Sequence, residues 1–131
     1  MTLHPFTDLT TVTAVGDGVF TATIDPMWTI GPKVHGGCMM AVCAAAAQQA
    51  IGSESELAPV AVSANYLSAP DPGEVQLTTT VRKHGRQVAL VDVQLAQNGR
   101  VAVSCSVTLG PLDAKPPRYQ ESLGASYLPV E

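Results

Sequence analysis

The segment that most constrains this fold runs from Lys33 to Ala50 and reads KVHGGCMMAVCAAAAQQA. A histidine and two glycines come first, and residues 37–51 then carry no charged side chain. The run of alanines favours a helix, and Gly52 followed by Ser53 would end it. A helix that is apolar around most of its circumference is buried on most sides. The sequence therefore predicts a central helix at about residues 37–51, with other elements wrapped around it.

Segments on both sides of this helix alternate apolar and polar side chains, as β-strands do. Strands are expected at 11–15 and 18–25, with Gly16-Asp17 as the turn, and then at 59–68, 74–84, 86–97 and 100–110. Short turns separate the last four segments, which predicts an antiparallel meander. The turn residues are Asp71-Pro72-Gly73, Gly85 and Asn98-Gly99. Residues 26–34 are expected to form a loop, because prolines stand at both 26 and 32.

One long helix and six strands in this order predict an α+β fold, in which an antiparallel sheet wraps around one central helix. Strand 86–97 is apolar on both faces, so it should be central or lie at an interface. One helix covers only one face of a sheet, so we expect a homodimer or higher homo-oligomer that covers the other face or extends the sheet. Residues 1–110 should form a single domain, followed by a proline-rich C-terminal tail at 111–131.

Composition argues against several classes of function. The net charge of −4 disfavours nucleic acid as a partner, because phosphate binding needs a basic surface. No apolar run reaches the ~18 residues of a membrane span, so no membrane partner is expected. The first ten residues lack the basic start and apolar stretch of a signal peptide, and the expected location is the cytoplasm. The three cysteines suit a reducing compartment. Cys38 and Cys43 would point to different faces of a helix, so we expect buried small residues rather than a disulfide or a metal site.

The order of elements and two sequence runs resemble the hotdog fold, and within it the acyl-CoA thioesterases. KVHGGCMMAVCAAAA is similar to the helix start of the phenylacetic-acid-degradation type. The run from Val19 to Leu109 is similar to the first half of the acyl-CoA thioesterase II type, which joins two hotdogs in one chain. In that type a strand region like VSANYLSAPDPGEVQLTTTVRKHGRQVALVDVQL follows the helix. The resemblance implies hydrolysis of an acyl-CoA thioester, with no cofactor other than the coenzyme A that is part of the substrate.

The glycines at the helix start suit this chemistry, because thioester hydrolysis develops negative charge on the carbonyl oxygen. Backbone N–H groups at a helix N-terminus can stabilise that oxygen, and glycine leaves room for the substrate to approach. The resemblance implies this role for Gly36, with Gly37 beside it and His35 assisting. An alternative stays open, in which the glycines only permit close contact between helix and sheet and His35 is an ordinary loop residue.

The sequence departs from the resemblance where the base is expected. The single-domain thioesterases carry a carboxylate in this helix, and the corresponding residue here is Ala44. Gln48 stands where a hydroxyl often orients water, and we expect Gln48 and Asn65 to position the water. An amide cannot act as a general base near neutral pH, so His35, Asp25 and Asp92 are further candidates. In the double-hotdog type the catalytic aspartate, hydroxyl and glutamine belong to the second half.

Candidate substrate contacts fall into an apolar and a basic group. The apolar group could line an acyl tunnel, with membership of the core as the alternative, and comprises Trp28, Met40 and Tyr66, together with Met27, Met39 and Leu67. The basic group could hold the phosphates of coenzyme A, with a solvated turn as the alternative, and comprises Arg82, Lys83 and Arg86, together with His84. Two other functions remain open, namely a non-catalytic module that binds acyl-CoA or an acyl carrier, and one half of a larger double-hotdog assembly.

Overall fold

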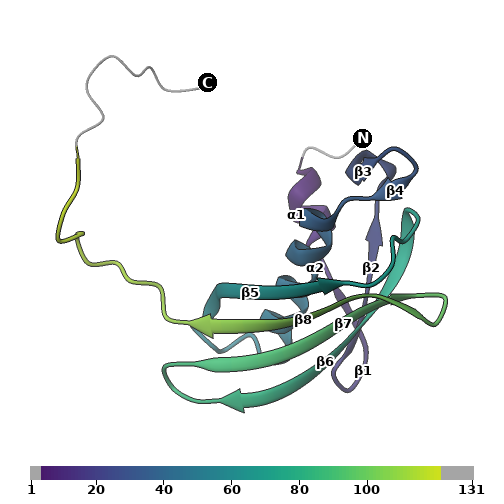
Figure 1. The fold of residues 1–131 in the computed structure, drawn as a ribbon. Helices are drawn as coiled ribbons and strands as arrows, with labels where there is room; N and C mark the ends of the chain where they lie inside the picture. Colours follow the sequence, from purple (N-terminus) through teal and green to yellow (C-terminus); the bar gives the residue numbers. More distant parts are fainter. Residues whose placement is uncertain (1–3, 122–131) are drawn as a thin grey trace.

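The computed structural model describes residues 4–121, and Figure 1 shows one long helix lying against a curved sheet. The elements before and including this helix are α1 (Pro5–Leu9), β1 (Thr13–Gly16), β2 (Val19–Ile24), the 3₁₀ turn η1 (Pro26–Trp28), β3 (Thr29–Ile30), β4 (Lys33–Val34) and α2 (Gly36–Ala50). The strands after it are β5 (Ala58–Tyr66), β6 (Gly73–His84), β7 (Ala89–Gln97) and β8 (Arg100–Gly110). The expected α+β architecture is confirmed, and α2 agrees with the predicted helix to within one residue at each end.

The main sheet has the strand order β1-β2-β6-β7-β8-β5, and all neighbouring strands are antiparallel. Strands β6, β7 and β8 form the predicted meander, and β7 is central as expected. The prediction is wrong for β5, which pairs with β8 at the far edge instead of with β6. Strand β2 occupies the place beside β6, where Val19 is opposite Thr78. The chain therefore crosses from one edge of the sheet towards its middle after β5.

A short loop makes this crossing. It spans three strand spacings, about 14 Å, which residues 67–72 can cover at about 3.3 Å per residue. The loop first follows β8, where the N–H groups of Leu67 and Ser68 donate to the Ala102 carbonyl at 2.8 and 3.2 Å. It then passes under β4, where the Val34 N–H donates to the Pro70 carbonyl at 3.1 Å. A turn signal in the sequence does not distinguish such a crossing from a return beside the same strand.

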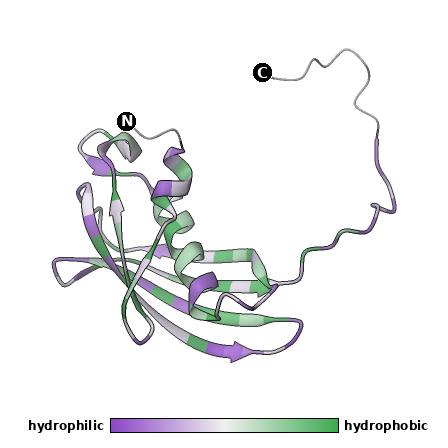
Figure 2. Cartoon of the chain, turned by 180° about the vertical axis from the view of Figure 1, so that it is seen from behind, coloured by the Kyte–Doolittle hydropathy of each residue, from purple (hydrophilic) through white to green (hydrophobic). Residues whose placement is uncertain are grey.

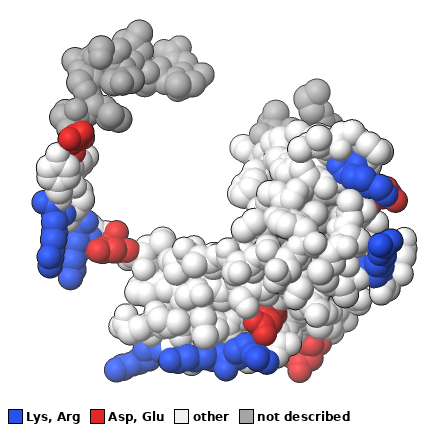
Figure 3. Space-filling view, in the orientation of Figure 1, with Lys and Arg blue, Asp and Glu red and all other residues white. Residues whose placement is uncertain are grey.

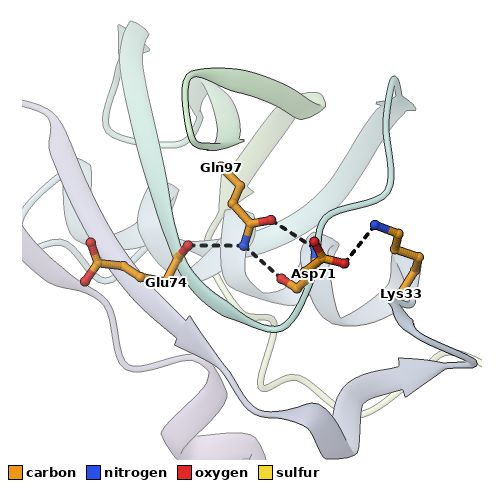
Figure 4. A network of polar contacts seen from close by, with 4 residues as sticks. All are labelled: Lys33, Asp71, Glu74 and Gln97. Atoms are coloured by element: carbon orange, nitrogen blue, oxygen red, sulfur yellow. Dashed lines mark hydrogen bonds and ion pairs between the residues drawn. The ribbon is translucent and has the colours of Figure 1, made fainter.

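One glutamine on β7 clamps the end of the crossing loop (Figure 4). The Asp71 N–H donates to Gln97 Oε1 at 2.9 Å, and Gln97 Nε2 donates to the Asp71 carbonyl at 2.8 Å. Lys33 Nζ pairs with Asp71 Oδ1 at 2.7 Å, so the same loop is joined to β4 just before α2. These contacts connect the crossing to the segment that leads into the helix.

The core lies between α2 and the concave face of the sheet. Figure 2 shows apolar colouring along much of this helix and at many positions of the strands. The buried side chains of α2 are Cys38, Met39, Val42, Cys43, Ala46 and Ala47. They meet inward-facing residues such as Leu77, Val91, Val93, Leu95, Val103 and Val107. The small helix side chains allow the curved sheet to approach closely, as the alanine run predicted. All three cysteines are buried and free.

Several local details differ from the predictions made from sequence. The turn between β1 and β2 uses Asp17-Gly18, one residue later than expected, because Gly18 supplies the positive φ of 70°. The Asn98-Gly99 hairpin is confirmed, with φ of 51° and 78°. Residues 26–34 are more ordered than a loop, since they form η1 and the small β3–β4 ladder. Helix α1 was not predicted, because five residues are too few for a periodic signal.

Beyond β8 the chain leaves the domain. Residues 111–121 are exposed and contain no helix or strand, and Figure 1 shows them running away from the sheet. The remainder of the expected tail, 122–131, lies outside the described residues. Across residues 4–121, no helix is both long enough and apolar enough to span a membrane.

Candidate active site

The first turn of α2 is held by hydrogen bonds on both sides of His35, which is its N-cap residue. His35 has an extended backbone, with φ −79° and ψ 155°, and its Nδ1 accepts the Cys38 N–H at 3.3 Å. The His35 N–H donates to the Trp28 carbonyl at 3.1 Å. Cys38 Sγ donates back to the His35 carbonyl at 3.1 Å. A histidine followed three residues later by a small buried side chain thus makes a closed cap at this end of the helix.

This cap leaves the N–H groups of Gly36 and Gly37 without an acceptor. The first N–H groups of any helix have no partner within the helix, and the Cys38 N–H is already taken by His35. Neither glycine N–H has an acceptor among residues 4–121. Gly37 is exposed and Gly36 half-buried, so a ligand can approach the pair. Together with the partial positive charge of a helix N-terminus, they can bind an anion or a polarised carbonyl oxygen.

Tyr66, at the end of β5, covers the other side of Gly36. Its hydroxyl donates to the Gly36 carbonyl at 2.9 Å. A Cβ at position 36 would lie 2.9 Å from two atoms of the tyrosine ring, so any other residue there would displace the end of the ring. A Cβ on Gly37 would lie 3.4 Å from the His35 ring, which is ordinary contact. Close helix–sheet contact therefore explains Gly36 but not Gly37.

The cap also limits what the His35 side chain can do. Its Nδ1 is an acceptor in the cap, so a neutral imidazole carries its proton on Nε2. In this arrangement His35 presents an N–H donor and not a base. The Trp28 ring lies beside it, with the ring centroids 6.0 Å apart and the planes at 57°. The structure thus brings Trp28, His35, Gly36, Gly37 and Tyr66 together, and Met40 follows one turn later on α2, half-buried.

The two amides expected to position water do not lie at this site within one chain. Gln48 is twelve residues beyond Gly36 on α2, about 18 Å along the helix axis. Asn65 is adjacent to Tyr66 on β5, and successive strand residues point to opposite faces. Because Tyr66 faces α2, Asn65 lies on the outer face of the sheet, where it shares a polar hollow of about 350 Å³ with Asp92 and Gln94. Within one chain, therefore, neither of the amides expected to position water lies beside Gly36.

The two aspartates that were candidate bases, Asp25 and Asp92, make their contacts away from Gly36. Asp92 Oδ1 accepts the Ser106 hydroxyl at 3.0 Å, and Arg82 Nε lies 3.3 Å from Asp92 Oδ2, both on the outer face of the sheet. Asp25 caps η1, where its Oδ1 accepts the Met27 N–H at 2.8 Å. Asp25 and Trp28 share the lining of a pocket of about 450 Å³ between α1 and η1.

The basic residues lie around the β6–β7 turn, at the end of the molecule where α2 finishes. Arg82, Lys83 and Arg86 are all exposed, and Figure 3 shows basic side chains gathered along that lower edge of the sheet. Arg86 and His84 line a hollow of about 960 Å³ together with Glu54 and Glu56 from the segment after α2. Within one chain this group and Gly36 are at opposite ends of the helix, so one chain does not join them into a single compact site.

Ala44 and Gln48 line a separate groove of about 620 Å³ on the helix face that the sheet leaves open. Gly37, Ala41, Ala44 and Gln48 recur at spacings of four, three and four residues, so they share one face of α2. Residues 6 and 10–12 form one wall of the groove. The position where a carboxylate was expected is therefore accessible, but it carries only a methyl group.

Cys38 and Cys43 in the core are not nucleophiles in this arrangement. Burial raises the pKa of the Cys38 thiol to about 11. A hydrogen bond to Cys105, together with burial, raises the pKa of Cys43 further. Both thiols therefore stay protonated near neutral pH, and a thiolate mechanism has no support here.

Sequence reasoning missed the residues that position the loops around this site. Gln97 and Asp71 are 26 residues apart, and Lys33 and Asp71 are 38 apart. No local pattern marks such pairs. The outward direction of Asn65, in contrast, could have been predicted from strand alternation once Tyr66 was assigned to the helix side.

Comparison with known proteins places this geometry in a family. Residues 24–110 match the family described as the acyl-CoA thioesterase N-terminal domain. An uncharacterized protein of Mycobacterium tuberculosis is 50% identical over 111 residues, which are 82% of this chain and 38% of that protein. The chain thus spans well under half the length of the curated relatives that it matches.

Two solved structures share the fold. A candidate thioesterase II from Thermobifida fusca superposes with a TM-score of 0.79 at 30% identity, over 92% of this chain and 44% of that one. The PaaI protein of the E. coli phenylacetic acid degradation operon superposes with a TM-score of 0.66 at 20% identity, over 76% of this chain and 80% of that one. The family match over residues 24–110 and the antiparallel sheet curved around α2 lead to one conclusion. This chain is a hotdog-fold domain that belongs to the acyl-CoA thioesterase N-terminal domain family.

Proposed function

We propose that this chain is an acyl-CoA thioesterase in which the N–H groups of Gly36 and Gly37 bind the thioester carbonyl oxygen. Water would attack the carbonyl carbon, the C–S bond would break, and coenzyme A would leave as a thiol once its sulfur gains a proton. The observation that carries the proposal is the pair of glycine N–H groups at the start of α2, held by His35 and Tyr66 and left without acceptors among the described residues. Coenzyme A enters as part of the substrate, and no cofactor is required.

The group that activates water has to come from outside this helix start. Ala44 stands at the carboxylate position, and His35 uses its acceptor nitrogen in the cap. The edge strand β5 offers a route to a second hotdog unit. It has nine residues and no charged side chain, whereas the other edge strand, β1, has only four. Edge strands are usually protected by charges, shortness, proline or a bulge. Pro59 and the bulge of β5 lie at its start, so residues 61–66 are suited to pair with another strand.

We propose that the second unit is another copy of this chain, paired β5 to β5 about a two-fold axis. If the pairing is antiparallel, the axis is perpendicular to the sheet and both α2 helices lie on the same face. Strand β5 runs antiparallel to α2, because Tyr66 meets Gly36 while Ala58 follows the end of the helix. The Gly36 end of one copy then lies beside the Gln48 end of the other. In this assembly Gln48 of the second copy would position water at Gly36 and Gly37.

The same pairing would bring the basic residues expected to contact coenzyme A towards the Gly36 end of the other copy. The β6–β7 turn lies at the end of the molecule where α2 finishes, since it shares a hollow with residues 51–57. The two-fold axis therefore places Arg82, Lys83 and Arg86 of one copy at the same end of the assembly as Gly36 of the other. We propose that this basic turn holds phosphates of coenzyme A across the pair.

The test is release of free thiol from a panel of short, long and aromatic acyl-CoAs. The informative variant is Gly37→Val, because position 37 accepts a side chain without meeting Tyr66 and the new side chain would crowd the N–H pair. Gly16→Val is the matched control, since Gly16 is exposed on β1 and an added Cβ would lie 3.7 Å from Val19 Cβ. We expect turnover by the wild type and the control, and its loss in Gly37→Val.

A non-catalytic acyl-CoA binding module is the second candidate, and the methyl group of Ala44 in the open groove favours it. This function would give no thiol release on any substrate while acyl-CoA still raised the unfolding temperature. Equal turnover by the wild type and Gly37→Val would instead reject the role of the glycines in hydrolysis.

A further inference from the structure

The tyrosine at the end of β5 has a contact that lining an acyl tunnel would not require. The Tyr66 hydroxyl donates to the Gly36 carbonyl at 2.9 Å, and the ring packs directly over Gly36. The ring can lie this close because Gly36 has no side chain, and the hydrogen bond holds it there. Tyr66 nevertheless keeps 48% of its surface exposed, so the contact does not come from deep burial in the core.

This hydrogen bond acts on the peptide unit that carries one of the two free donors. The carbonyl of Gly36 and the N–H of Gly37 belong to the same planar amide, in which the nitrogen shares its electron pair with the carbonyl. The Gly36 carbonyl is also the acceptor for the ordinary helix bond from the N–H four residues later. A second donor on that oxygen draws electron density from the nitrogen, and hydrogen bonds arranged in this way strengthen one another.

We infer that Tyr66 is a positioning residue for the thioester reaction, which polarises the Gly36–Gly37 peptide and makes the Gly37 N–H a stronger donor to the developing oxyanion. The inference rests on the proposed function, and it replaces the role of Tyr66 as an acyl-tunnel residue. Tyr66 acts here through the backbone of the helix and does not contact the substrate. The ring fixes the position of the first turn, and the hydroxyl adjusts the strength of its donor.

The other bonds of this turn fall on different peptide units. The Trp28 carbonyl accepts the His35 N–H, and His35 Nδ1 accepts the Cys38 N–H. Cys38 Sγ, a weak donor, bonds to the His35 carbonyl at 3.1 Å, which belongs to the amide of the Gly36 N–H. None of these bonds falls on the amide between Gly36 and Gly37. Among the described residues, the Tyr66 hydroxyl is therefore the side-chain donor that acts on this peptide unit.

The decisive variant is Tyr66→Phe, which keeps the ring over Gly36 and removes only the hydroxyl. Loss of one oxyanion donor costs about 10²–10³ in kcat, and polarisation changes a fraction of that donor's strength. We therefore expect kcat to fall about three- to ten-fold, with KM changed by less than about two-fold. The Gly37 amide proton resonance should move upfield, since its N–H becomes less polarised. Tyr119→Phe, which removes an exposed hydroxyl in the tail, is the matched control and should change neither quantity.

Two results would overturn the inference. An unchanged kcat together with an unchanged Gly37 resonance would show that the hydroxyl does not influence the donor. A rise in KM with kcat unchanged would show that Tyr66 binds substrate, as an acyl-tunnel residue would. The Gly37 resonance reports the polarisation even if the wild type releases no thiol. Failure of the proposed function would therefore show as absent thiol release, and failure of this inference as an unchanged resonance.

Discussion

The ring of Tyr66 occupies the space that a side chain at position 36 would need. A Cβ on Gly36 would lie 2.9 Å from Cε1 and Cζ of this ring and 3.0 Å from its hydroxyl oxygen. The two residues are 30 positions apart and come from α2 and β5. Glycine at 36 therefore lets the Tyr66 ring pack in this place and also suits substrate approach, and substitutions at 36 alone cannot separate the two roles.

The Gly36–Tyr66 contact predicts a strong coupling between substitutions at the two sites. Gly36→Ala should lower the free energy of unfolding by about 1–3 kcal/mol, because the ring must move and its hydrogen bond is lost. In a Tyr66→Ala background the added methyl group has space, so the same substitution should be nearly neutral. Urea denaturation of the four proteins in this double-mutant cycle measures the coupling. Costs that agree within about 0.5 kcal/mol in the two backgrounds would contradict the contact.

The amide of Gln97 predicts a local stabilising effect at the crossing loop. Gln97→Ala should cost about 1–2 kcal/mol, because it removes two hydrogen bonds to the Asp71 backbone. Gln94→Ala, on the exposed outer face of the same strand, should change stability by less than about 0.5 kcal/mol. Thermal unfolding of both variants provides the comparison, and equal shifts would argue against the clamp. Lys33→Met should also have a small effect, since its ion pair with Asp71 is largely exposed.

The uncharged edge of β5 predicts that one added charge will block assembly. Val60→Lys places an ammonium group on an exposed residue of the edge strand, and the two-fold pairing would bring one such charge from each copy into the joint. We expect the wild type to have twice the 13.6 kDa mass of one chain and Val60→Lys to be a single chain with reduced thiol release. Thr13→Lys, on the opposite edge strand, should behave like the wild type. Light scattering after size-exclusion chromatography measures the mass, and a wild type that is already a single chain would refute the pairing.

The buried Cys38 thiol predicts a loss of stability at high pH. Its folded pKa, about 11, lies above the ordinary value of 9.0 because burial disfavours the thiolate. The neutral thiol therefore stabilises the fold fully below pH 9.0, and this contribution is lost as the pH rises through about 11. Urea midpoints measured across this range should fall less steeply for Cys38→Ala than for the wild type. Parallel profiles would show that another group causes the loss.

A reactivity measurement complements the pH series. The Cys38 and Cys43 thiols of the native protein should react slowly with a thiol reagent near neutral pH, and all three thiols should react at once when the chain is unfolded. Rapid reaction of Cys38 or Cys43 in the native protein would show that the core opens around it.

The helix, the strands and most of the turns could be predicted from the sequence because each depends on neighbouring residues. The uncharged alanine-rich run and Gly52 bracketed α2, and Asn98-Gly99 marked a hairpin with two positive φ angles. The cap of His35 on Cys38 is also local, since three residues separate them. The candidate site at Gly36 and Gly37 was found for the same reason, because a helix N-terminus presents free N–H groups wherever it occurs.

Only the tertiary structure decided which strands are neighbours and which side chains meet at the helix start. The sequence predicted β5 beside β6, but the pairing of β2 with β6 sends β5 to the edge, and a turn signal carries no information about pairs formed far along the chain. Tertiary structure also separates two predicted residues from Gly36. Gln48 lies far along the helix, and Asn65 lies on the opposite face of the sheet. Tertiary structure likewise joins Tyr66 to Gly36 across 30 residues. Backbone periodicity is a short-range property, whereas packing contacts depend on how the whole sheet curves around α2.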